Sequence, residues 1–356
     1  MRGALRVRTR AEIPRAEWDA FADASSEAWL WHRSDLIGAQ TFWPGRSDSS
    51  FAVCDGADRI LALMPLHRTR ARIARSIDIV RFNSLGGHAC ADWLRPDRRS
   101  DVLSTIETEL HARMRRERAV SFELQIAPLT PSLRDPRHGT DNPALALGFA
   151  DCSTHTWMVD LARPADEIRR NYSSLTRREL RKSESRRITI REAQGSRDLE
   201  TYYRLHLETY GRTGARPFPI NYFQAIFETC IPARFARILF AERAGTVVAA
   251  QNTAVYKQGA VYWTGASATD KGAGENRMLF DAQIMAARSA GCLRYETGEA
   301  FPETASEKER GLSQFKRSFG ASLEAYYRGI RPASNPLLRA LWELRKLLPR
   351  RALEFS

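Results

Sequence analysis

The sequence lacks the motifs that mark many familiar catalytic sites. It contains no G-x-S-x-G turn, no H-E-x-x-H motif, no Walker phosphate loop and no Rossmann glycine fingerprint. Its seven histidines are dispersed and do not show the spacing of metal ligands. Serine-hydrolase, zincin, P-loop and dinucleotide-dependent chemistry are therefore not indicated.

Cysteine is also scarce, and no two cysteines form a C-x-x-C pair. Such scattered residues indicate neither a disulfide framework nor a zinc site. We therefore expect no bound metal. The five cysteines are Cys54, Cys90, Cys152, Cys230 and Cys292.

Long apolar runs are missing as well. No stretch approaches the ~20 apolar residues that a membrane-spanning helix needs. The basic segment at residues 1–8 is not followed by the apolar region of a signal peptide. The sequence thus predicts a cytoplasmic protein.

Positive charge, in contrast, is abundant. The chain has 55 Lys and Arg against 42 Asp and Glu, which gives a net charge of +13. This balance favours anionic partners such as nucleotides, coenzyme A, tRNA or a lipid surface. A length of 356 residues with 43% hydrophobic residues predicts two domains with cores of their own.

The clearest order of elements lies between Phe235 and Arg328. Three runs rich in Val, Ile, Tyr and Trp, separated by glycine-bearing breaks, predict an antiparallel meander. Apolar residues then recur at helical spacing from Met278 to Ala286, and Gly291 follows as a helix end. A strand at 293–297, a helix near 311–320 and a strand at 323–328 complete the segment.

This order resembles the core of the GNAT acyltransferases. The strand end at 265–267, Asn276 ahead of the helix and the run from Phe315 to Gly320 resemble its FemAB-related branch. That branch contains peptidoglycan-bridge aminoacyltransferases and the CelD/BioF-like N-acetyltransferases. The basic run at 174–184 is similar to a helix of the same branch, and the likeness spans residues 14–332.

The first half repeats the same order of elements. A hairpin at 51–66, an arginine-rich link at 68–75, a strand at 77–82, a helix at 97–118 and a strand at 120–126 follow one another. We therefore expect an α/β fold of two tandem GNAT-like domains, each a mixed, largely antiparallel sheet flanked by helices. The expected divisions are a degenerate domain at 1–153, an acyltransferase domain at 154–332 and a basic helix at 333–356.

The resemblance places the chemistry in a V-shaped opening between the strands near 260–266 and 293–297. It implies that Lys316 stabilises the negative charge that develops on an acyl carbonyl oxygen. A general base must deprotonate the attacking amine, and Glu296 and Glu299 are both candidates.

In GNAT enzymes a glycine-rich loop before a helix holds the coenzyme A pyrophosphate. The matching positions here include Gly272 and Gly274, and Asn276 and Arg277 follow them in the helix. The sequence departs from the family pattern at Thr269, which takes the Gln/Arg place. Glu275 also adds negative charge beside the expected phosphates, and both departures weaken a coenzyme A assignment.

Two further groups of residues are candidates for substrate binding. Clustered basic side chains on one helix can hold phosphates through paired hydrogen bonds, and the helix at 174–184 supplies Arg177, Arg178 and Lys182. Tyr256 and Trp263, on the predicted strands, could line the groove, although aromatic residues on strands are usually part of the core.

The C-terminal segment has an apolar stripe on a basic helix. The stripe consists of Leu337, Leu341, Leu344 and Leu348, widened by Leu338 and Trp342. Such a helix either lies on an anionic membrane at 335–351 or packs on the body of the protein or on a second subunit. Packing is the interpretation that we favour.

These features predict an enzyme that moves an acyl group to a primary amine by direct attack. The acceptor is expected to be a small molecule or a cell-envelope or polysaccharide precursor. Acyl-CoA is the first candidate donor and aminoacyl-tRNA the alternative. A non-catalytic membrane or scaffold protein that uses the basic surface is the third hypothesis, and a location at the inner face of the membrane would suit it.

Overall fold

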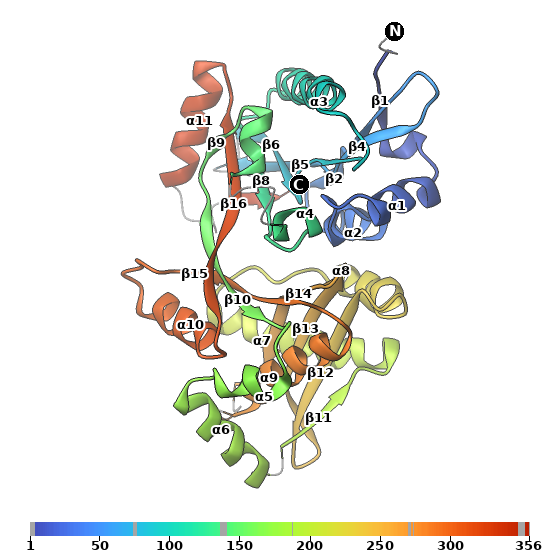
Figure 1. The fold of residues 1–356 in the computed structure, drawn as a ribbon. Helices are drawn as coiled ribbons and strands as arrows, with labels where there is room; N and C mark the ends of the chain where they lie inside the picture. The colour runs from blue at the N-terminus through green and yellow to red at the C-terminus, as the bar shows by residue number, and fades with distance from the viewer. Residues whose placement is uncertain are drawn as a thin grey trace. The chain divides into compact units, whose positions relative to one another are not determined.

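The computed structural model describes residues 4–73, 77–135, 141–186, 188–269, 272, 274–347 and 353–355. The chain forms two compact units, each with mixed sheets and helices (Figure 1). The first unit contains Met1–Ser153 together with Tyr326–Ser356, and the second contains Thr154–Ala325. The predicted fold class is confirmed. The division of the C-terminal part differs from the expected one, because residues 326–356 belong to the first unit.

The first unit contains two sheets. The smaller sheet has the order β1 (Arg6–Thr9), β3 (Phe51–Cys54), β4 (Ile60–Met64) and β7 (Ala89–Cys90). The larger has the order β16 (Ser322–Pro332), β8 (Ser121–Ile126), β6 (Ile77–Leu85), β5 (His67–Ile73) and β17 (Leu353–Phe355). Two short strands extend it, β2 (Arg46–Asp48) on β5 and β9 (Ala150–Asp151) on β16.

The helices of the first unit cover these sheets. They are α1 (Arg15–Ala24), α2 (Ser34–Gln40), α3 (Pro96–Arg116), α4 (Pro131–Arg134) and α11 (Pro336–Leu347), with the 3-10 turns η1 (Arg10–Glu12), η2 (Leu30–His32) and η4 (Pro143–Leu147). Helix α3 buries Val102, Ile106 and Leu110, which recur every four residues and so share one face. This face packs against a core that contains Phe51 and Phe122.

The arginine-rich link expected at 68–75 is instead a strand, β5. Thr69 and Ala71 are buried, whereas the alternating Arg70 and Arg72 are exposed and pair with Asp78 at 2.6 and 3.1 Å. Period-2 alternation of inward small residues and outward arginines is compatible with a half-buried strand. The high charge concealed this pattern.

The second unit has one sheet in the order β11, β12, β13, β14, β15, β10 and β16. Its further strands are β10 (Thr154–Asp160), β11 (Ile188–Glu192), β12 (Ala236–Arg243), β13 (Thr246–Tyr256), β14 (Gly259–Ser267) and β15 (Arg294–Ala300). Its helices are α5 (Ala165–Arg170), α6 (Ser174–Ser185), α7 (Leu199–Thr213), α8 (Ile220–Ala225), α9 (Glu275–Ser289) and α10 (Glu307–Arg317), with the turns η5 (Gly195–Asp198) and η6 (Ile226–Cys230). Three strands, α9, β15, α10 and β16 follow one another as predicted.

Each unit contains one pair of parallel strands with a helix between them in sequence. In the first unit β6 and β8 pair over five positions, from Arg81 opposite Ser121 to Leu85 opposite Gln125. The Gly86 amide then donates to the Gln125 carbonyl oxygen at 2.7 Å. This pair is therefore hydrogen-bonded to its end, unlike its counterpart in the second unit.

Helix α11 packs on the first unit. Trp342 is buried in a cluster with Ala71, Ile79 and Val120, and Leu338 and Leu341 pack against it. Part of the apolar stripe is thus covered by protein, which supports the packed interpretation over a helix lying on a membrane. Leu348, the last residue of the stripe, lies outside the described residues. In the described part of the chain, no helix is long and apolar enough to span a membrane.

Replacing the buried tryptophan of α11 tests this packing. Trp342→Ala should lower the free energy of unfolding by about 3–5 kcal/mol, because it leaves a cavity over β5, β6 and the start of β8. Leu337→Ala is the matched control. Leu337 is 76% exposed on the same helix, so its loss should change stability by less than about 0.5 kcal/mol. Equal effects in urea denaturation would contradict the packing.

Candidate active site

Strands β14 and β15 part where the predicted chemistry lies. Their parallel pairing covers three positions, from Gly259 opposite Arg294 to Val261 opposite Glu296. Both strands continue beyond this point, to Ser267 and Ala300. Each keeps its other neighbour, since β14 pairs with β13 and β15 pairs with β10.

An extra residue in each strand accompanies the parting. Trp263 is inserted in β14 opposite the Asn252–Thr253 step of β13, and Thr297 is inserted in β15 opposite the Trp157–Met158 step of β10. A β-bulge bends its strand and increases the local twist. The bulge at Thr297 comes directly after the last paired position, and the bulge at Trp263 comes two residues after it. The two strands therefore bend there and no longer pair with each other.

Lys316 is buried beside the parted strands. It shares the buried face of α10 with Ser313 and is only 5% exposed. Its Nζ donates a hydrogen bond to the backbone oxygen of Glu299 at 2.9 Å. Burial lowers the pKa of Lys316 to about 8, although the carboxylates of Glu296 and Glu299 act in the opposite direction.

Gly298 allows this close approach. It has a φ of +99°, and a Cβ at this position would lie 2.9 Å from Lys316 Nζ. Any other residue would therefore combine an unfavourable backbone conformation with a collision against the ammonium group.

Glu296 supplies a buried carboxyl group at the last paired position. It is 3% exposed, and its Oε1 accepts a hydrogen bond from Thr156 Oγ1 at 2.8 Å. Its Oε2 is buried and has no hydrogen-bond partner among the described residues. Burial raises the pKa of Glu296 to about 7, whereas the Thr156 hydrogen bond and the Lys316 charge lower it. A carboxyl group with this pKa can exchange a proton near neutral pH.

An aromatic layer supports Lys316. Tyr262 of β14 stacks on Phe280 of α9 with ring centroids 4.9 Å apart, and Phe280 contacts both Phe315 and Phe319 at 5.1 Å. The layer lies beside Lys316 in sequence and space, and α10 turns the lysine side chain inward rather than toward solvent.

The loop before α9 differs from an open phosphate site. A Cβ at Gly272 would lie 2.9 Å from both carboxylate oxygens of Glu275, so this side chain folds back over the first turn. Glu275 is buried and pairs with Arg243 at 3.0 Å. Gly274 lies against Ser183 of α6, whose Oγ would be only 2.1 Å from a Cβ. These glycines permit close packing by Glu275 and Ser183.

The residues expected to follow in the helix lie in the first turn of α9. Asn276 is half-buried there. Arg277 stacks on Phe315, with its guanidinium carbon 5.4 Å from the ring centre. Burial lowers the pKa of Arg277, although Glu179 raises it. Arg277 thus packs against α10 through the ring of Phe315.

The three basic residues of α6 have different surroundings. Arg177 donates to the carbonyl oxygens of Arg170 and Tyr172, so it holds the end of α5. Arg178 and Lys182 are exposed and pair with Glu179 at 3.7 and 3.5 Å.

The two predicted groove aromatics lie apart from Lys316. Tyr256 is buried at the turn between β13 and β14, where its ring meets Phe235 at 5.6 Å. Trp263 is the bulge residue and contacts Tyr222 of α8 at 6.1 Å. The structure therefore brings together Lys316, Glu296 and the Glu299 backbone, whereas Tyr256 lies at the opposite end of the hairpin.

Sequence reasoning missed three residues of this site. Thr156 comes from β10, 140 positions before its partner Glu296, and no local pattern indicates such a pairing. Tyr262 looked like an ordinary strand aromatic. Gly298 carried the one available signal, because a glycine inside a strand suggests a bulge or a close approach.

The comparisons with known proteins agree with this geometry. Residues 169–317 match the family model described as an acetyltransferase (GNAT) domain. The structure of FemX is similar over 92% of this chain and 98% of that one, with a TM-score of 0.68 and 14% identity. L-PGS from Bacillus licheniformis is similar over 94% and 97%, with a TM-score of 0.59 and 14% identity.

A tandem GNAT protein from the clavulanic acid biosynthesis pathway covers 93% of this chain and 99% of its own, with a TM-score of 0.54 and 13% identity. No curated protein sequence matches the chain. At these identities the structural neighbours establish the fold alone. Residues 169–317 thus match the model of a GNAT acetyltransferase domain, and the chain shares its fold with FemX and the tandem GNAT protein.

Proposed function

We propose that the second unit transfers an acyl group from an activated ester or thioester to a primary amine, at the point where β14 and β15 part. One observation carries this proposal: a buried ammonium, Lys316, and a buried carboxyl group with one unpartnered oxygen, Glu296, lie at that point. Buried charges of this kind are costly for folding, and perturbed pairs are typical of active sites.

In the proposed reaction Glu296 takes a proton from the ammonium form of the acceptor. The free amine attacks the acyl carbonyl carbon, a C–N bond forms and the carbonyl oxygen becomes negatively charged. Lys316 stabilises that oxygen by exchanging its hydrogen bond to the Glu299 carbonyl for one to the substrate. The bond to the leaving oxygen or sulfur then breaks, and the leaving group takes the second proton of the amine.

The roles of the surrounding residues are part of the same proposal. Arg277 and Asn276, in the first turn of α9, are candidates for contacts with the donor. Arg178 and Lys182 are exposed and remain candidates for contacts with phosphates of the acceptor or donor. The hydrogen bonds of Arg177 to two carbonyl oxygens support a structural role for it.

A specific observation favours aminoacyl-tRNA over acyl-CoA as the donor. The carboxylate of Glu275 already occupies the first turn of α9 and lies over Gly272, where a GNAT pyrophosphate would bind. A second anion there would be repelled by a buried negative charge. The net charge of +13 suits a nucleic acid.

The acceptor would be an amine on a small molecule or on a cell-envelope, lipid or polysaccharide precursor. Both candidate donors are made in the cytoplasm, which is therefore the proposed location. Peripheral membrane contact would then come from the acceptor rather than from α11, because α11 packs on protein.

Substitution of the central lysine tests whether the site is catalytic. Lys316→Ala should lower kcat by about 10²–10³-fold, the usual effect of losing one oxyanion donor. Lys308→Ala is the matched control, because Lys308 is exposed on the same helix, and it should retain wild-type turnover. Product formation would be followed with candidate amines. Unchanged turnover in Lys316→Ala, with an intact fold, would contradict the proposal and favour the scaffold alternative.

Treatment with ribonuclease distinguishes the two donors. Charged tRNA and acyl-CoA would each be offered with the same amine, with and without active ribonuclease. We expect transfer from charged tRNA that stops when ribonuclease is added, while heat-inactivated ribonuclease has no effect. Transfer from acyl-CoA that is insensitive to ribonuclease would contradict the tRNA donor but not the acyl-transfer site.

A further inference from the structure

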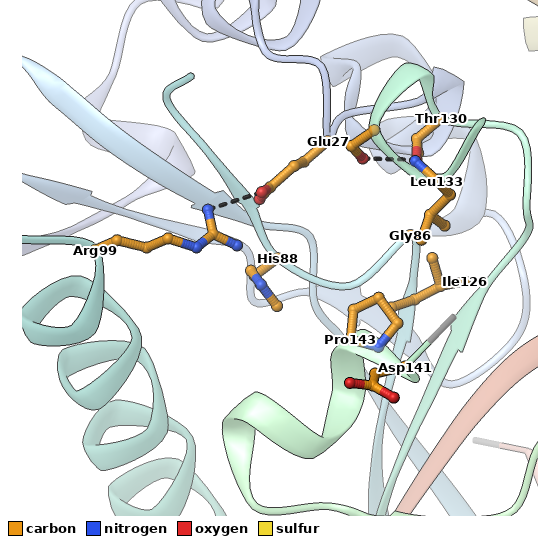
Figure 2. Close-up of a pocket in the computed structure, with 10 residues that line it drawn as sticks. Glu27, Gly86, His88, Arg99, Ile126, Thr130, Leu133, Asp141 and Pro143 are labelled. Carbon is orange, nitrogen blue, oxygen red and sulfur yellow. Dashed lines mark hydrogen bonds and ion pairs between the residues drawn. The ribbon is translucent and has the colours of Figure 1, made fainter. Parts of the chain in front are cut away.

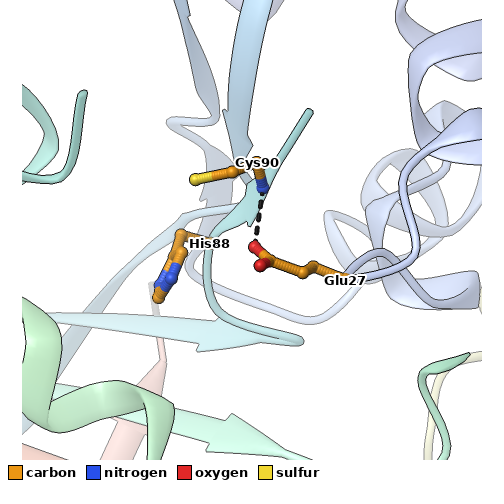
Figure 3. A group of neighbouring side chains, drawn as sticks. All are labelled: Glu27, His88 and Cys90. Carbon is orange, nitrogen blue, oxygen red and sulfur yellow. Dashed lines mark hydrogen bonds between the residues drawn. The ribbon is translucent and has the colours of Figure 1, made fainter. Parts of the chain in front are cut away.

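A second group of reactive side chains lies in the first unit, away from the parted strands. Glu27 precedes η2, His88 follows β6 and Cys90 lies in β7. Each offers one ligand atom, and these three atoms all lie within 4.8 Å of one another (Figure 3). Glutamate, histidine and cysteine are all zinc ligands.

The spacing of these atoms fits one metal ion. Three atoms no more than 4.8 Å apart share a centre that is at most about 2.8 Å from each, against typical Zn–S and Zn–N bonds of about 2.3 and 2.0–2.1 Å. A shift of at most about 0.5–0.8 Å by each side chain would close this difference. The group is therefore nearly arranged for a shared ion.

His88 provides an independent sign of a missing ligand. It is buried, and its Nδ1 has no hydrogen-bond partner among the described residues. A buried polar nitrogen without a partner normally costs stability. Coordination of a metal ion would satisfy this nitrogen.

The carboxylate of Glu27 is held in place by two contacts. Cys90 N donates to Oε2 at 2.9 Å, and Arg99 Nη1 lies 2.7 Å from Oε1. Outer contacts of this kind commonly orient metal-binding carboxylates. The carboxylate of Glu27 and a thiolate of Cys90 would match the two charges of a zinc ion.

A cavity of about 180 Å³ adjoins the group. Glu27, His88 and Arg99 line its polar part, and Ile126 and Pro143 line an apolar part (Figure 2). Three protein ligands with a fourth position open to a cavity are characteristic of zinc sites that bind water or substrate.

We propose that Glu27, His88 and Cys90 bind one Zn²⁺ ion, whose fourth coordination position faces this cavity. The site lies just beyond the β6–β8 pair of the first unit, and it is independent of the transfer chemistry proposed for the second unit. Binding would release the thiol proton of Cys90, because the thiolate is the form that ligates metal.

Metal titration of the full chain tests the proposal. Protein stripped with a chelator should take up one Zn²⁺ per chain by elemental analysis. With Co²⁺ it should develop thiolate-to-cobalt charge-transfer absorption in the near ultraviolet. Cys90→Ala should lose both signals, whereas Cys54→Ala should keep them, since Cys54 is an equally buried cysteine of the same unit. Glu27→Gln should bind Zn²⁺ at least about tenfold more weakly.

Either of two results would contradict the zinc site. If wild-type protein shows no thiolate–cobalt band, or if Cys90→Ala and Cys54→Ala bind metal alike, the group is only a buried ion pair beside a core thiol. The wild-type cobalt spectrum decides the question even if Cys90→Ala fails to fold.

Discussion

The hydrogen bond from Lys316 to the Glu299 carbonyl oxygen is the interaction on which the account of the second unit depends. Where β14 and β15 part, backbone groups lose the partner that a continuous sheet would supply, and buried backbone groups need a substitute. The ammonium group of Lys316 is such a substitute partner, and Gly298 leaves room for it because it has no side chain. The same bond holds a desolvated cation at the place where an acyl oxygen could replace the carbonyl.

Each unit has two parallel strands with a helix between them in sequence, but the pairing of these strands ends differently in the two units. In the first unit β6 and β8 stay paired through Leu85 and Gln125, so no opening forms between them. The group of reactive side chains in this unit lies instead beyond the strand ends. There His88 and Cys90 lie close to Glu27, which comes from the connection between α1 and η2. In the second unit the bulges at Trp263 and Thr297 accompany the end of the pairing, beside the buried Lys316 and Glu296.

Local patterns in the sequence were sufficient to predict the element order of the second unit. They were insufficient where the structure depends on contacts between distant residues, or where a high charge hides the pattern of a strand. The arginines of β5 concealed a strand, and Arg177 gave no sign that it would bind backbone carbonyl oxygens. Glu27 is 61 residues from His88 in the sequence, so no motif search could join them.

The pH dependence of kcat/KM tests the central claim most directly, since the pKa values of Glu296 and Lys316 lie near 7 and 8. Activity should rise as Glu296 loses its proton near pH 7 and fall as Lys316 loses its proton near pH 8, which gives a bell-shaped profile. Glu296→Gln should remove the acidic limb, and Glu299→Gln should leave it in place. A profile that is flat from pH 6 to 9, or an acidic limb that survives in Glu296→Gln, would contradict the account.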